Sequence, residues 1–82
     1  MEKVVENIQE EAEKILQRIN NIAPNLHCVC LIFESFVSQK LEHREGWFDS
    51  SSEAVNFATR LEEEYKSLQE RGLIGAFHVY RF

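Results

Sequence analysis

The chain has 82 residues, of which 44% are hydrophobic and 28% charged, and its net charge is −5. A chain of this length builds one hydrophobic core, so we expect a single domain over residues 1–82. The acidic balance disfavours direct binding to nucleic acid and favours a protein partner with a basic surface. The sequence has neither a membrane-length apolar run nor a signal-like N-terminus, so we expect a cytoplasmic protein with no membrane partner.

The first predicted element is a helix from Glu2 to about Asn21, ended by Pro24. Its apolar residues recur in steps of three and four, as on one buried helix face. They are Val5, Ile8, Ala12, Ile15, Ile19 and Ile22, widened by Val4 and Leu16. The opposite face carries Glu6, Glu10 and Glu13. Packing against a sheet is the favoured interpretation, and a coiled coil is the alternative because the stripe covers three heptads.

The next element is an apolar run over residues 26–37, which predicts a central strand covered on both faces. A loop over residues 38–40 and an edge strand over 41–48 follow. This loop length would place Glu34 opposite Arg44 and Ser35 opposite His43, and we favour it because opposite charges across strands stabilise a hairpin. Gly46 indicates a bulge or a close approach of the backbone.

A second helix is predicted to begin at Ser50, because Ser50 and Glu53 have the spacing of a capping box. Its buried stripe consists of Ala54, Phe57, Ala58, Leu61, Tyr65 and Leu68. Gly72 is placed to end it in a Schellman motif, with Leu73 after it. The last strand then covers residues 74–82, antiparallel to the central strand and beside it.

These elements predict an α+β fold of order αββαβ, a two-layer sandwich in which both helices cover one face of a three-stranded, mainly antiparallel sheet of order 2-1-3. The uncovered face would expose an apolar patch that a partner or a second copy must bury. It would contain Leu26, Cys28, Cys30, Ile32, Phe36 and Phe48. The last strand would add one alternate set to this face, either Phe77 and Val79 or Tyr80 and Phe82. The alternative is that the first helix crosses to that face and covers it.

The residues that could support chemistry are few. Cys28 and Cys30 lie two residues apart in the predicted central strand, and the other soft metal ligands are His27, His43 and His78. A structural zinc site needs four suitably spaced ligands, and these residues do not have that spacing. We therefore interpret the cysteines as small, reduced, buried side chains. Ser35 beside His43 lacks a third catalytic group. We expect no enzyme, no catalytic residue, no metal and no cofactor.

The sequence thus predicts a small acidic protein-binding protein. We expect an inhibitor or regulator that docks on a larger protein with a basic or nucleic-acid-handling surface, as a phage or mobile-element inhibitor of a defence system would. The expected binding residues are Glu6, Glu10, Glu13, Glu62, Glu63, Ile32, Phe36 and Phe48. We also expect a homodimer. The alternative function is a small homodimeric ligand-binding domain.

Overall fold

The computed structural model describes the backbone of residues 2–22 and 25–82, and the side chains of residues 6–22 and 25–82. Its elements are α1 (Glu2–Ile22), β1 (His27–Ser35), β2 (Lys40–Phe48), α2 (Ser51–Glu70) and β3 (Ile74–Arg81). The predicted order αββαβ is confirmed. The predicted stop at Pro24, and the side chains of Val4 and Val5 in the first apolar stripe, lie outside the described residues.

The three strands form one antiparallel sheet of order β2-β1-β3, as predicted. β1 is the central strand and is buried along most of its length, with Val29, Cys30 and Leu31 fully inaccessible. Its run of apolar residues fits a strand with cover on both faces. The α+β class and the sheet order were therefore correct.

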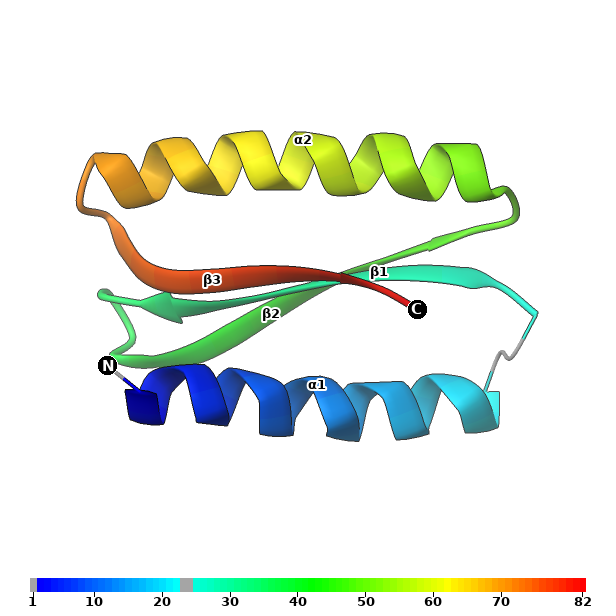
Figure 1. Cartoon of the computed structure of the whole chain (residues 1–82), viewed down its shortest axis with the longest axis horizontal. Coiled ribbons are helices and arrows are strands. Elements are labelled where there is room, and N and C mark those ends of the chain that lie inside the picture. The colour runs from blue at the N-terminus through cyan, green and yellow to red at the C-terminus, as the bar shows by residue number, and fades with distance from the viewer. Residues whose placement is uncertain (1, 23–24) are drawn as a thin grey trace.

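The helices cover opposite faces of the sheet, so the prediction that both cover one face was wrong (Figure 1). α1 packs on Cys28, Cys30 and Ile32, and α2 packs on Val29 and Leu31. Because successive side chains of a strand point to opposite faces, β1 contributes to two separate cores. The fold has three layers, and the alternative arrangement, with the first helix across the back of the sheet, is the one observed.

The hairpin between β1 and β2 has a register three residues away from the predicted one. Ser35 pairs with Lys40, which leaves a four-residue loop over residues 36–39. Gln39 takes a φ of 61°, and its N–H donates to the Ser35 carbonyl over 2.9 Å. The Ser35 hydroxyl accepts from the N–H groups of Val37 at 3.3 Å and Ser38 at 3.2 Å, which holds the start of the loop.

This register separates the charge pair on which the prediction relied. Glu34 lies opposite Leu41, and Arg44 lies opposite Leu31. The Arg44 guanidinium instead sits over the ring of Tyr65, 5.6 Å from its centroid. Because the shift is an odd number of residues, it also exchanges the faces of β2: Leu41 and Trp47 belong to the α1 core.

The ends of α2 follow the local sequence signals. The Ser50 hydroxyl accepts from the N–H of Glu53 over 3.2 Å, as an N-cap does. At the other end the N–H of Leu73 donates to the Leu68 carbonyl and that of Gly72 to Gln69, both over 3.0 Å. Gly72 has a φ of +75°, so the helix ends in the predicted Schellman motif.

Candidate protein interface

The apolar residues predicted to bind a partner do not form an open surface. Ile32 is 1% exposed and lies beneath α1. Phe48 packs in the α2 core, with its ring 5.1 Å from that of Phe57. Phe36 alone is well exposed, at 53%, and it lies in the hairpin loop. The expected docking face is absent because α1 covers it.

The acidic residues predicted to bind a partner are all exposed, but they lie on two surfaces. Glu6, Glu10 and Glu13 are on α1, whereas Glu62 and Glu63 are on α2. The two helices lie on either side of the sheet (Figure 1), so one flat partner surface cannot contact both groups. The fold therefore offers two separate acidic surfaces.

The outer surface of α1 is formed by Glu6, Glu10 and Glu13, and none of these carboxylates forms an ion pair with a described cation. The ion pair found along this helix joins Lys14 to Glu11 at 3.6 Å. Among the described side chains, no cation comes within ion-pair distance of the three outer carboxylates. Glu62 and Glu63 on α2 likewise have no described cation within ion-pair distance. Lys14 lies one helical turn from Glu10, as Lys66 does from Glu62, so the two acidic surfaces are alike in this respect.

An ion pair links α1 to β2. The guanidinium of Arg18 pairs with the carboxylate of Glu45, and Nε2 of His43 lies 3.4 Å from the same carboxylate oxygen. Arg18 and Glu45 are far apart in sequence, so this contact joins the helix to the sheet. The buried face of α1 consists of Ile8, Ala12, Ile15 and Ile19, so Glu6 and Glu10 point away from the sheet. Glu13 is also exposed, and it lines the hollow between α1 and the side chains of Tyr80 and Phe82.

The opposite flank of α1 lies beside β3 and holds a row of aromatic side chains. Two of them, Tyr80 and Phe82, were one of the two sets expected on the open face of the sheet. His78, Tyr80 and Phe82 follow one another on the α1 side of β3, with ring centroids 4.3 Å and 5.8 Å apart. Two shallow hollows of about 270 Å³ and 220 Å³ lie between this row and α1, and Gln9 lines both. The alternation of these rings with Phe77, Val79 and Arg81 was the available signal.

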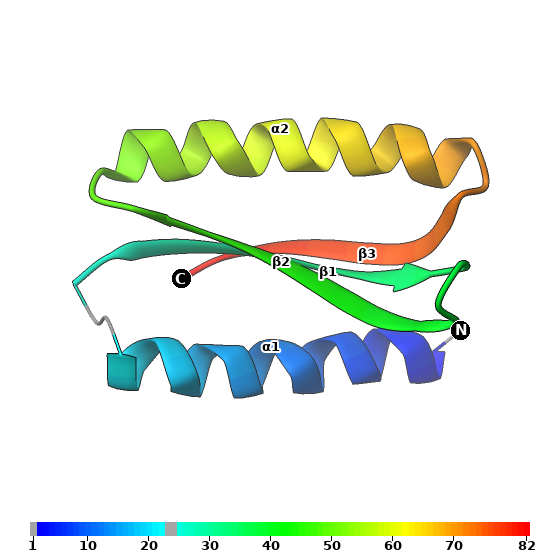
Figure 2. The same cartoon turned by 180° about the vertical axis from the view of Figure 1, so that it is seen from behind.

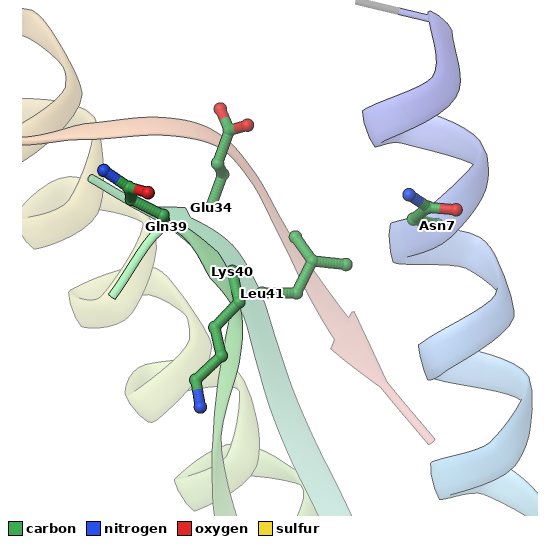
Figure 3. Close-up of a pocket in the computed structure, with 5 residues that line it drawn as sticks. All are labelled: Asn7, Glu34, Gln39, Lys40 and Leu41. Atoms are coloured by element: carbon green, nitrogen blue, oxygen red, sulfur yellow. The ribbon is translucent and has the colours of Figure 1, made fainter. Parts of the chain in front are cut away.

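Another hollow, of about 300 Å³, lies at the end of the hairpin (Figure 3). Asn7, Glu34, Gln39, Lys40 and Leu41 line it. Figure 3 shows that these side chains diverge: Leu41 points toward α1, whereas Lys40 and Glu34 point away from each other. Small-molecule sites are mostly apolar clefts with convergent polar groups, so this hollow gives no support to the ligand-binding alternative.

Neither the two cysteines nor Ser35 has the surroundings expected of a catalytic or metal-binding residue. Cys28 and Cys30 are free and buried, and burial raises the pKa of both thiols, that of Cys30 to about 12. Both are therefore protonated at neutral pH, and a thiol is a poor nucleophile and metal ligand compared with a thiolate. Ser35 lies opposite Lys40 rather than His43, so the expected Ser35–His43 neighbours are not formed.

The side chains of residues 6–22 and 25–82 contain no group of three or more His, Cys, Asp or Glu residues that could hold a metal ion. No helix in the described part of the chain is both long and apolar enough to cross a membrane.

Comparison with known proteins gives no relative: no family model, no curated protein and no solved structure matches the chain.

Proposed function

We propose that this protein is a small acidic protein-binding domain that inhibits or regulates a larger partner, and that it docks on a basic surface of that partner through Glu6, Glu10 and Glu13. The observation that carries the proposal is the exposure of these three carboxylates on α1, where no described cation lies within ion-pair distance of them. A partner would need basic side chains at helical spacing or a basic groove. Occupying such a groove would block whatever acidic molecule the partner ordinarily binds there.

Electrostatics support association with a basic protein. A net charge of −5 on a domain of 82 residues attracts a basic surface from a distance and raises the encounter rate. Exposed charges contribute more to the rate and selectivity of binding than to its final affinity. We place this activity in the cytoplasm, where the free thiols of Cys28 and Cys30 stay reduced.

Charge reversal tests the proposal. We would compare Glu10→Lys/Glu13→Lys on α1 with the matched control Glu62→Lys/Glu63→Lys on α2, because both double variants change the net charge equally. Each is used as bait in native lysate of the source organism. We expect the α1 variant to lose a partner that the wild type and the α2 variant both retain.

The kinetics of the captured partner give a second readout. Since steering by opposite charges changes association rates by about tenfold or more, the α1 variant should associate at least that much more slowly, and raising the salt concentration should slow the wild type likewise. A partner that binds all three proteins equally, or whose affinity does not change with salt, would overturn the proposal.

A further inference from the structure

We infer that the outer edge of β3 binds a second copy of the same chain, so that two β3 strands pair antiparallel and two three-stranded sheets become continuous. β3 is one of the two edge strands. β3 is the strand nearest the viewer in Figure 1, and β2 is the nearest in Figure 2. In both views the helices lie above and below the sheet, so neither helix crosses the edge formed by β3. Within residues 2–22 and 25–82, no segment pairs with that edge.

The backbone groups available at this edge follow from the pairing with β1. The N–H of Phe82 donates to the Cys28 carbonyl over 2.8 Å, and the N–H of Cys28 donates back over 3.3 Å. Residues alternate in direction along a strand, so residues 80 and 78 also face β1, whereas the N–H and C=O groups of Phe77, Val79 and Arg81 face outward. These groups form a ready template for another strand.

The two edge strands differ in charge: β2 carries several charged side chains, which discourage pairing with another strand, whereas β3 carries one. β2 carries Lys40, Glu42, Arg44 and Glu45, which is how edge strands avoid further pairing. In β3, which reads IGAFHVYR, Arg81 is the only formally charged residue. Two copies with net charge −5 repel each other overall, so self-association is least opposed along a strand that itself carries no acidic residue. The acidic side chain beside this edge is Glu13 of α1, which lines the hollow next to Tyr80 and Phe82.

The sequence of β3 is self-complementary about Val79. With the two-fold axis at this residue, Phe77 of each copy lies opposite Arg81 of the other, and His78 lies opposite Tyr80. The first pair brings a cation to an aromatic ring and the second pairs two aromatic rings, and both are favourable across strands. Each contact occurs twice because of the symmetry. This palindromic match favours a second copy over an unrelated peptide.

The dimer would also cover the aromatic row. His78, Tyr80 and Phe82 line the hollows on the open flank of α1, and Tyr80 and Phe82 are only half-buried. A second sheet continued from β3 would bring its own aromatic row next to this one. Burial of these rings adds apolar area to the main-chain hydrogen bonds of the strand pair.

A proline substitution can block the edge and spare the monomer. Arg81→Pro removes an N–H that faces outward, so it costs no hydrogen bond to β1. The matched control is His43→Pro on β2, whose N–H also faces outward because its partner Ile32 faces β3. By analytical ultracentrifugation from micromolar to millimolar concentration, we expect dimers for the wild type and His43→Pro, and monomers for Arg81→Pro.

A second variant leaves the backbone unchanged. His78→Glu places two acidic groups as diagonal neighbours across the axis, and we expect the dimer dissociation constant to rise about tenfold or more, with an unchanged circular dichroism spectrum. A wild type that stays monomeric at every concentration would overturn the inference, as would an Arg81→Pro or His78→Glu variant that dimerises like the wild type. A monomer that instead captures an extended peptide at this edge would overturn the second copy as the occupant.

Discussion

Gly46 shows how a single missing side chain allows part of the α2 core to pack. It lies in β2 beneath two phenyl rings whose centroids are 5.1 Å apart, those of Phe48 and Phe57. A Cβ at this position would lie 2.8 Å from Cε2 of Phe57 and 2.9 Å from Cε2 of Phe48. These distances are shorter than van der Waals contact, so the rings reach the strand only because residue 46 is glycine.

We therefore expect Gly46→Ala to lower the free energy of unfolding by about 1–3 kcal/mol, the usual cost of an extra methyl group in a packed core. Urea denaturation followed by Trp47 fluorescence measures this change. In a Phe57→Leu background the same substitution should cost clearly less, because the closest ring is gone. An equal cost in both backgrounds would show that the rings are not the cause.

The buried thiol of Cys30 predicts a dependence of stability on pH. Its pKa is raised from 9.0 to about 12, chiefly by burial, with the neighbouring Cys28 adding to the shift. The unfolded chain loses this proton near pH 9 while the folded chain keeps it. The stability associated with the protonated thiol is therefore complete below pH 9 and is lost as the pH rises from about 9 toward 12.

The comparison that isolates Cys30 uses Cys30→Ala. Burial also raises the pKa of Tyr65 and of Tyr80, and both contribute to the change of stability at high pH. The slope of unfolding free energy against pH must therefore be compared between the two proteins. We expect a shallower fall above pH 9 in Cys30→Ala. Identical slopes for the two proteins would contradict the assignment to this thiol.

At the scale of single elements, the ends of α2 depend on local contacts. Ser50 satisfies one free N–H at the start, and Gly72 permits the left-handed turn at the end. Both signals involve residues within a few positions of each other, so they operate whatever the rest of the chain does. This is why the sequence alone predicted these boundaries correctly.

We expect Ser50→Ala to lower the free energy of unfolding by about 1 kcal/mol, because an N–H at the helix start loses its acceptor. The matched control is Ser52→Ala in the first turn, where the side chain is exposed and alanine favours the helix. Chemical denaturation of both variants gives the comparison. Similar losses for the two substitutions would argue against the cap.

The hairpin register could not be predicted in the same way. The loop ends with Gln39 at a positive φ, a position where sequence reasoning expects glycine or asparagine. The Ser35 side chain, not a charge pair, holds the turn. An error of three residues changed which residues of β2 join which core, and it moved Phe48 from the expected interface into the α2 core.

At the scale of the whole molecule, the sequence predicted two layers where the fold has three. Periodicity shows that a helix has one buried face, but it does not show which face of the sheet the helix covers. The signal available in the sequence was the apolar run that forms β1. Such a run predicts a strand buried on both faces, as β1 is, and that strand needs cover on each side of the sheet. The candidate acidic residues were predicted correctly as exposed. Among the candidate apolar residues, Phe36 is exposed as expected. Ile32 is buried because α1 covers it, and Phe48 packs in the α2 core because of the register of β2.

The contribution of α1 packing to stability can be measured by replacing two isoleucines of this helix, one buried and one exposed. Ile15 is 5% exposed against the sheet, whereas Ile22, which the same periodic stripe contained, is 68% exposed. We expect Ile15→Ala to cost about 2–4 kcal/mol and Ile22→Ala less than about 0.5 kcal/mol. Thermal or urea unfolding gives both values. A small cost at Ile15 would mean that α1 does not pack tightly on the sheet.

The crossover from β1 through β2 and α2 to β3 has a consequence for synthesis on the ribosome. β1 and β2 can form their hairpin early, but β1 has no neighbour on its other side until residues 74–81 have been translated. In that interval the most apolar strand of the nascent protein presents open hydrogen-bonding groups. Early packing of α1 against the hairpin would shelter one face of that strand while its last neighbour is being made.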